Sequence, residues 1–446
     1  METVHKLSPA LALPEYDLYG VPPTQLIVDR DITTEHRPIS VINDSSSPIQ
    51  FEIHTAVDEY INLSKSEIKI SMKISISKAN LGTDKDVKKE DWDKICPVNN
   101  LLHSMFKAVK LTIGGAEVTS ASNNYPYLSY IETLIHESPE AKRTYLESGF
   151  WHRDKTGSMD SINGVRNIRI KPTGVPLEDG CVFELKGNLH IDLAKQHKSL
   201  LGGVTIGVTL LPNDPKFYLI YENTLVPKVT ILEAKLLIHR AHVLPAVVLG
   251  HNKALEHANA RYFITRREVK SMIIQKGQID CYLNNVENGV MPRKAYIAFV
   301  SNEAYNGHNE KNPFFFKNYS IRHIACYIDG HQYPQIPYTP DFASKRFIDS
   351  YYGLFETANQ VKYNTNIDIT REEYYNGFTI FGFDFTPDLS DGCVRSGYVS
   401  PVKRGNLRIE VRFGIALAEN ISAIIFCEYD NCIEIPSNRV AFKDFN

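Results

Sequence analysis

Histidine and carboxylate side chains are the residues of this chain whose spacing comes closest to a catalytic pattern. His190 and Asp192 have the His-x-Asp spacing that holds iron(II) in oxygenases when a distant histidine supplies the third ligand. His239 and His242 are the candidates for that third position. The four residues define one hypothesis, a non-haem iron site inside a β-sandwich.

The apolar neighbours of His190 argue against this hypothesis. Leu189, Ile191 and Leu193 alternate with the two polar residues, so in a strand they take the core face. His190 and Asp192 then point outward, whereas iron ligands must converge inside the sandwich. We therefore interpret these two residues as part of an ordinary solvated strand face.

Other catalytic signatures are absent from the sequence. None of the fifteen histidines stands two residues from another, which excludes a cupin-type metal pair on one strand. No nucleophile elbow, phosphate-binding glycine loop or dinucleotide-binding glycine motif occurs. The sequence predicts no catalytic, cofactor-binding or metal-ligating residue and no cofactor, and thus a protein that is not an enzyme.

The cysteines also lack a functional spacing. They form no Cys-x-x-Cys pair, and an odd number cannot pair completely within one chain. Most lie in apolar strand patterns such as "IACYI", where a thiol packs as a small hydrophobe. We expect buried free thiols and a reducing compartment for the seven cysteines, which are Cys96, Cys181, Cys281, Cys326, Cys393, Cys427 and Cys432.

Composition excludes several classes of function. The chain has 446 residues, of which 43% are hydrophobic, and this length suggests two or three domains. Its formal charge of -3 gives no field that favours nucleic acid or an anionic membrane. No apolar run reaches the roughly 18 residues of a membrane helix, and no signal-peptide pattern opens the chain. We expect a soluble, non-secreted protein with no membrane span and no direct sequence-specific contact with nucleic acid.

Alternation of apolar and polar residues with a period of two dominates the sequence. In "IKISMKISIS", residues 68–77, every second residue is apolar, and "GVTIGVTL" and "LRIEVRF" repeat the pattern. Such half-buried strands are typical of antiparallel sheets. Helices are few and short, with predicted starts after Ser138, at a capping box of Thr370 and Glu373, and at Pro245.

One hairpin pattern occurs twice. "FKAVKLTIGGAEV", which begins at Phe106, and "SIRHIACYIDGHQY", which begins at Ser320, match when Ile113 is set against Ile328, an offset of 215. The offset aligns the Gly-Gly and Asp-Gly dipeptides, which tolerate the positive φ angles of tight hairpin turns. The chain therefore makes the same hairpin once in each half.

The elements around each hairpin recur in the same order. A loop rich in aromatic residues and proline follows each hairpin, then a helix, then a closing series of strands. We infer an all-β protein of two tandem antiparallel jelly-roll domains, each an eight-stranded β-sandwich with short helices in its loops. The predicted boundaries are 1–45 for an extended N-terminal arm, 46–243 for the first jelly roll and 244–446 for the second.

The predicted arm is acidic. Its prolines and its lack of alternation indicate extended chain that lies on its own or a neighbour's surface. Residues 1–44 carry three basic and seven acidic side chains, a net charge of -4. This charge excludes a basic arm that neutralises packaged nucleic acid.

Several longer stretches resemble a known family when they are taken together. The chain resembles the double jelly-roll major capsid proteins, and most closely those of Polinton (Maverick) elements and adintovirus-like viruses. The stretches that carry the resemblance are "DLYGVPPTQ" at Asp17, "PVNNLLHSMFKAVKLTIGG" at Pro97, "YPYLSYIETLI" at Tyr125, "NPFFFKNYSIRHIACYIDG" at Asn312, "RGNLRIEVRF" at Arg404 and "CEYDNCIEI" at Cys427.

The resemblance implies a structural role without an active site. It implies a homotrimer whose six jelly rolls form a pseudo-hexagonal, hexon-like capsomer of an icosahedral shell. The expected partners are the chain itself, neighbouring capsomers, and minor capsid or penton proteins beneath them, which the arm would contact. The expected location is the virion capsid, after assembly in the nucleus or cytoplasm of the host cell.

Two further functions remain open at this stage. The aromatic loops, with Tyr125 and Tyr127 in "NNYPY" and a second set in "HQYPQIPY", could stack on sugar rings, as in a jelly-roll protein that binds glycans or a receptor. A capsid-derived protein that a host genome has retained for another purpose is the other alternative.

Overall fold

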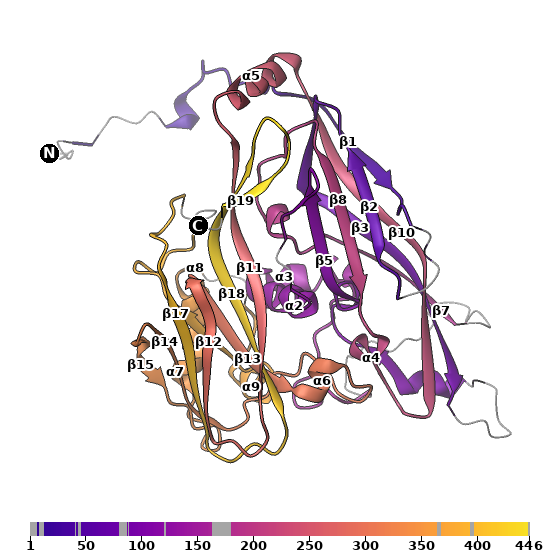
Figure 1. Ribbon diagram of the computed structural model, residues 1–446, viewed down its shortest axis with the longest axis vertical. Helices are drawn as coiled ribbons and strands as arrows, with labels where there is room; N and C mark the ends of the chain where they lie inside the picture. Colours follow the sequence, from indigo (N-terminus) through magenta and orange to yellow (C-terminus); the bar gives the residue numbers. More distant parts are fainter. Residues whose placement is uncertain are drawn as a thin grey trace.

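The computed structural model consists of two β-sandwiches that lie side by side, with the strands of both running along the long axis of the molecule (Figure 1). It describes residues 7–8, 13–40, 42, 46–79, 87, 89–119, 122–162, 180–363, 367–392 and 397–444. The first half of the chain forms one sandwich and the second half forms the other.

The first sandwich has two four-stranded antiparallel sheets. One sheet has the order β1-β10-β3-β7, with bounds Val28–His36, Leu225–Val243, Glu59–Lys78 and Cys181–Gly187. The other has the order β2-β8-β5-β6, with bounds Ile49–His54, Thr205–Pro212, Phe106–Ile113 and Ala116–Glu117. A separate two-stranded sheet pairs β4 with β9, Ile95–Pro97 and Leu219–Tyr221.

The second sandwich repeats this plan. One sheet has the order β11-β18-β13-β16, with β19 added to β18; the bounds are Ala260–Ile274, Ile421–Ile435, Lys294–Ser301, Ile380–Asp384 and Phe442–Asp444. The other has the order β12-β17-β14-β15, with bounds Asp280–Val290, Arg404–Phe413, Ile321–Ile328 and His331–Tyr338. In both halves the eight main strands, numbered along the chain, pair in the orders 1-8-3-6 and 2-7-4-5. The predicted pair of tandem jelly rolls is confirmed.

The predicted repeat of the hairpin is confirmed residue by residue. Strands β5 and β14 have eight residues each, and both of their ends differ by the predicted offset of 215. The turn residues of both hairpins have positive φ, from 48° at Asp329 to 87° at Gly115, which explains the glycines at these positions.

Alternation places the cores where the sequence predicts them. In β3, four alternate side chains from Ile68 to Ile74 are fully buried, while the two lysines and the serine between them are partly exposed. The predicted buried thiols are confirmed for the six cysteines that the structure describes, and Cys393 lies outside the described residues.

Short helices occupy the loops. The Ser138 side chain accepts a hydrogen bond from the amide of Ala141, Thr370 with Glu373 forms the expected capping box, and α5 begins at Pro245, so the three predicted helix starts are confirmed. The α-helices are α1 Leu101–Ser104, α2 Tyr125–His136, α3 Pro139–Lys142, α4 Pro215–Tyr218, α5 Pro245–Leu255, α6 Asn302–Asn306, α7 Ile348–Thr357, α8 Gln360–Tyr363 and α9 Arg371–Asn376. The 3-10 helices are η1 Pro14–Tyr16, η2 Lys89–Lys94, η3 Tyr145–Gly149 and η4 Asp192–Lys195.

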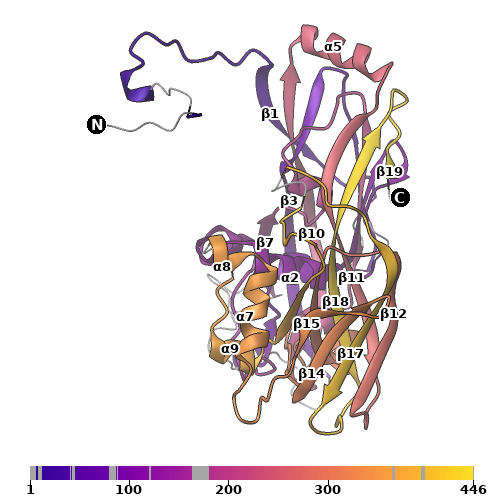
Figure 2. The same ribbon diagram turned by 90° about the vertical axis from the view of Figure 1, so that its left-hand side faces the viewer.

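One part of the predicted arm is an integral strand. Val28–His36, which the pattern of the sequence places in the extended arm, form β1, which pairs with β10 and begins the first jelly roll. Apolar and polar residues alternate only weakly in β1, because it is an edge strand and mostly exposed. The preceding residues project from the end of the molecule that carries α5 (Figure 2), and Leu18, Tyr19 and Val21 are 79–94% exposed.

Candidate functional site: the interface between the jelly rolls

Helix α2 lies between the two sandwiches (Figure 1) and contacts β5 of the first and β11 and β18 of the second. Pro126 stands in its first turn, where the missing N–H needs no partner. Ten of its twelve residues are buried, Glu132 among them. A helix enclosed in this way brings buried polar groups to the junction of the two domains.

Aromatic side chains form the apolar part of this junction. The ring of Phe314, from the second half, stacks on Tyr130 of α2 with 4.1 Å between the ring centroids. Tyr127 and Phe217 of the first half contact the same phenylalanine ring edge-on. Phe314 and Phe316 are fully buried, so the ring of each belongs to the core of the molecule.

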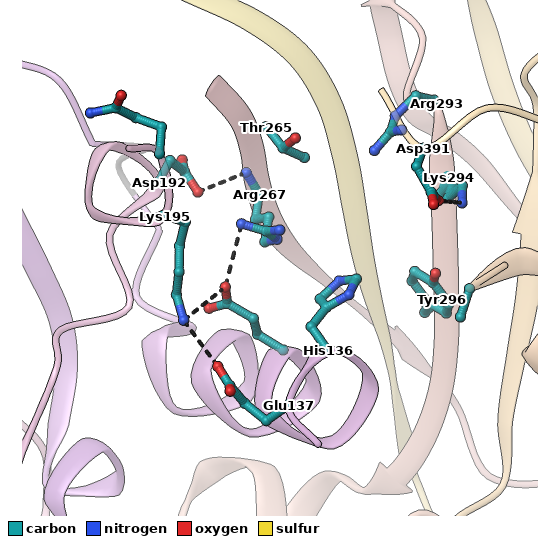
Figure 3. A pocket seen from close by; sticks show the side chains of 13 residues that line it. His136, Glu137, Asp192, Lys195, Thr265, Arg267, Arg293, Lys294, Tyr296 and Asp391 are labelled. Atoms are coloured by element: carbon teal, nitrogen blue, oxygen red, sulfur yellow. Dashed lines mark hydrogen bonds and ion pairs between the residues drawn. The ribbon is translucent and has the colours of Figure 1, made fainter. Parts of the chain in front are cut away.

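Charged side chains form the other part. The Glu132 carboxylate lies 3.3 Å from Nη1 of Arg267 on β11 and 3.5 Å from Nζ of Lys195 on η4. Its second oxygen contacts Nδ1 of His190. Figure 3 shows Lys195 and Arg267 pointing toward the helix that carries His136 and Glu137. Glu132 thus joins three segments, two from the first half and one from the second.

A second buried carboxylate faces the same arginine. Glu428 of β18 lies 3.2 Å from Nε of Arg267 and 3.3 Å from Nη2 of Arg293, the residue before β13. His136 of α2 lies 2.8 Å from the same carboxylate. Arg267 therefore stands between two carboxylates that are each 2–3% exposed, one from each half of the chain.

The charges in this cluster keep one another ionised. Burial alone would raise the pKa of Glu132, but Lys195, Arg267 and His190 outweigh it and hold that pKa well below its ordinary value. Burial would lower the pKa of Arg267, yet the carboxylates around it raise it. The junction is consequently a network of fixed charges around a cavity of about 190 Å³.

Arg153 forms a third contact between the halves. Its two terminal nitrogens reach Asp368 and Glu373 of the second half, the latter at 2.9 Å. Lys142 lies 3.1 Å from the same Asp368 carboxylate. Ion pairs, stacked rings and a shared helix thus hold the two sandwiches in one relative orientation.

The predicted solvated strand face at His190 and Asp192 is wrong. Strand β7 ends at Gly187 and the chain turns into η4, so strand parity does not apply to these residues. The His190 side chain is 7% exposed and contacts Glu132, while Asp192 accepts a hydrogen bond from the backbone N–H of Arg267. Burial raises the pKa of Asp192 to about 7.

The hypothetical iron ligands do not meet. His239 lies 3.4 Å from Asp31 and His242 lies 3.4 Å from Asp58, and both histidines belong to strand β10. Among the residues that the structure describes, no three histidine, cysteine or carboxylate side chains stand close enough to hold a metal ion.

The first of the two sets of proposed sugar-stacking rings, in "NNYPY", is also placed differently from the prediction. Tyr125 and Tyr127 are 5% and 1% exposed, because they lie on α2 and not on an open loop. They cannot stack on a sugar. Sequence reasoning missed the buried charges of α2 as well, since a glutamate within an aromatic helix gives no sign of its partners on distant strands.

Comparison with known proteins finds one relative in sequence and several solved structures with the same fold. No protein-family model matches the chain. An uncharacterized protein of Caenorhabditis elegans is 24% identical over 408 residues, which cover 90% of this chain and 94% of the nematode protein. A chain of the Sputnik virophage structure matches with a TM-score of 0.67 and 11% identity, over 98% of this chain and 93% of the other.

Two solved capsid proteins match over similar lengths. The Faustovirus major capsid protein has a TM-score of 0.58 and 10% identity, over 93% of this chain and 91% of its own. The mavirus major capsid protein has a TM-score of 0.51 and 11% identity, over 99% and 97%. The chain has the fold of double jelly-roll major capsid proteins. Within the described part of the chain, the helices are all too short or too polar to cross a bilayer.

Proposed function

We propose that this chain is a structural major capsid protein that assembles as a homotrimer. The observation that carries the proposal is the repeated strand order of two jelly rolls that lie side by side with a charged and aromatic junction between them. Three copies contribute six similar domains, so threefold symmetry approaches sixfold symmetry and gives a pseudo-hexagonal outline. Such a unit tiles the faces of an icosahedral shell.

The proposal assigns a role to each segment of the chain. Residues 46–243 and 244–446 serve as the two jelly-roll domains, extended at the first boundary by β1. The exposed residues before β1 contact neighbouring capsomers or minor capsid and penton proteins. The protein acts in the virion capsid, after assembly inside the host cell, without catalysis, a cofactor or sequence-specific contact with nucleic acid. Similarity to the mavirus protein supports a relation to Polinton and adintovirus-like elements.

Electron microscopy of the purified protein tests this function. Negatively stained single particles are expected to show a six-cornered outline with threefold averages, and concentrated samples are expected to form sheets or shells. Particles with the size of a single chain under all conditions would contradict the proposal.

The nematode relative favours a second candidate. A protein of an animal that is similar over 90% of this chain is compatible with a capsid-derived protein that a host genome has retained. Such a protein is expected to keep the fold while losing the ability to form shells, so the assembly assay separates the two candidates.

A further inference from the structure

Lys294, the first residue of β13, is buried in the second jelly roll. Its side chain is 2% exposed, although lysine is rarely found fully buried unless it is paired. Its Nζ lies 3.2 Å from Oδ1 of Asp391, the contact that Figure 3 marks, and 3.7 Å from Oδ2 of Asp384. Asp384 belongs to β16 and stands directly opposite Lys294 in the register of the two strands. One amine therefore lies between two carboxyl groups in the interior of the molecule.

The two oxygens of the Asp384 carboxyl have different surroundings. Oδ1 accepts hydrogen bonds from both the backbone N–H and the hydroxyl of Thr386. Oδ2 has no hydrogen-bond partner among the described residues, because its contact with Lys294 at 3.7 Å is too long for one. Two donors on one oxygen stabilise the negative charge that develops there when a nucleophile attacks the carbonyl carbon. The carboxyl of Asp384 is thus arranged as an electrophile.

Burial supports this arrangement. The side chain of Asp384 is 8% exposed, and burial raises its pKa above the ordinary value. A raised pKa favours the uncharged acid, which is the form of a carboxyl group that an amine can attack.

Asp391 occupies the position of a base. Its Oδ1 accepts hydrogen bonds from Nζ of Lys294 at 3.2 Å and from Nδ2 of Asn359 at 2.6 Å. Asn359 also donates to the backbone carbonyl of Leu389, so the Asp391 side chain is held to the loop that follows β16. A carboxylate within hydrogen-bond reach of an ammonium group can take up its proton and leave a nucleophilic amine.

A nucleophile, an electrophile and a base therefore meet at one point. We propose that the side chains of Lys294 and Asp384 join in an intramolecular amide bond that ties β13 to β16. Strand β16 is the end strand of the sheet β11-β18-β13-β16, so the bond fastens the edge of this sheet covalently. The bond forms within one chain, and the proposal does not depend on the capsid function.

The reaction balances without a co-reactant. Asp391 takes a proton from the ammonium group of Lys294, and the resulting amine attacks the side-chain carboxyl carbon of Asp384. The new C–N bond forms, the bond from carbon to Oδ2 breaks, and Oδ2 leaves as water with two of the three ammonium protons. The third proton remains on the amide nitrogen. An ammonium and a carboxylate thus become a neutral amide and one water molecule, and nothing is oxidised or reduced.

The site favours both the rate and the product of this reaction. Groups held in contact react as if at an effective concentration of about 10⁵–10⁸ M. The amide also replaces two buried charges, which are costly to keep away from water. Lys294 and Asp391 line the cavity of about 190 Å³ at the junction, which has room for the water that leaves.

Mass spectrometry of the denatured full chain tests the proposal. Most molecules are expected to be lighter than the sequence mass by one water molecule, about 18 Da. A tryptic digest should contain one cross-linked pair of peptides, and fragmentation should place the bond between Lys294 and Asp384. A succinimide at Asp329-Gly330 or Asp391-Gly392 would lose the same mass. Mild alkali reopens a succinimide and restores the mass, whereas the amide is expected to survive it.

Two buried lysines provide matched variants. Lys142 is 5% exposed and lies 3.1 Å from Asp368, but the other oxygen of that carboxyl is held by Arg153. Lys294→Met is expected to have its full sequence mass, while Lys142→Met keeps the deficit of about 18 Da. Asp391→Asn should slow formation of the bond at least about tenfold, because it removes the base. Melting curves show whether each variant folds, and the wild-type mass decides the question without any of them.

Three results would overturn the proposal. A wild-type mass equal to the sequence mass, in fresh and in aged samples, would show that Lys294 and Asp384 form an ordinary buried ion pair. A deficit that mild alkali reverses would identify a succinimide. A deficit that persists in Lys294→Met would place the lost water elsewhere in the chain.

Discussion

Glu132 and Arg267 lie 3.3 Å apart across the boundary between the two jelly rolls. The carboxylate belongs to helix α2 of the first half and the guanidinium to β11, the first strand of the second. Arg267 also contacts Glu428 at 3.2 Å, so one cation serves two buried carboxylates. This relationship makes the orientation of the two domains sensitive to a single side chain.

Replacing Arg267 with methionine is therefore expected to destabilise the protein strongly. The change leaves Glu132 and Glu428 buried without the cation between them, and breaking a buried pair in this way costs about 3–5 kcal/mol. Arg261→Met is the matched control on the same strand, because its side chain is 61% exposed and its pair with Glu434 contributes at most about 1 kcal/mol. Urea unfolding at one protein concentration measures the free energy of unfolding of both variants. Equal losses of stability in the two variants would contradict the prediction that Arg267 stabilises the junction.

Phe314 is expected to be the dominant apolar contact of the junction. Its ring is fully buried against Tyr130, so Phe314→Ala should lower the free energy of unfolding by about 3–5 kcal/mol. Phe263→Ala, at a position that is 43% exposed, is expected to cost about 1 kcal/mol or less. Thermal or urea unfolding compares the stability of the two variants. A small loss of stability in Phe314→Ala would mean that the junction relaxes into the space left by the ring.

Asp154 is expected to make the protein less stable as the pH rises from about 4 to 7. Burial raises its pKa to about 7, whereas in the unfolded chain the carboxyl has a pKa near 3.8. The folded state thus holds the proton more tightly, and the stabilisation is fully present below about pH 4 and is lost as pH rises through 7. The loss is about 1.4 kcal/mol per pH unit between about pH 4 and 7, and it levels off above pH 7, where the carboxyl is ionised in both states.

Asp154→Asn should remove this part of the pH dependence. The amide still accepts from Nδ2 of Asn312, which lies 3.1 Å from the carboxylate in the wild type. The variant is expected to lose less stability than the wild type between pH 5 and 7, with a residual slope from Asp192, whose pKa is also raised to about 7. Melting temperatures across this range measure the slope, and an unchanged slope in the variant would refute the assignment.

Much of the fold can be predicted from the sequence because each strand carries its own period-two pattern. The offset of 215 between the two hairpins, confirmed by β5 and β14, suffices to reveal the duplication. Edge strand β1 escaped the prediction because an exposed strand needs no apolar face. The role of Glu132 escaped it because its partners lie on strands and loops far away in sequence, and a single charged residue gives no signal of such contacts.

Deleting residues 1–25 is expected to leave the fold intact. The described side chains of this segment are largely exposed, so the melting temperature should change by no more than about 2 °C. Deleting residues 1–36 removes β1 and its pairing with β10 and should destabilise the first jelly roll strongly. Under the proposed function the shorter deletion also abolishes assembly beyond the single capsomer, which electron microscopy detects. A large loss of stability on deletion of residues 1–25 would show that the arm packs on its own chain.

The proposal that three copies of this chain form one capsomer is tested most directly by the mass of the native protein. Light scattering on a sizing column is expected to give a stable species near three times the 50.6 kDa of one chain. A mass equal to one chain, unchanged at high protein concentration, would contradict the capsomer.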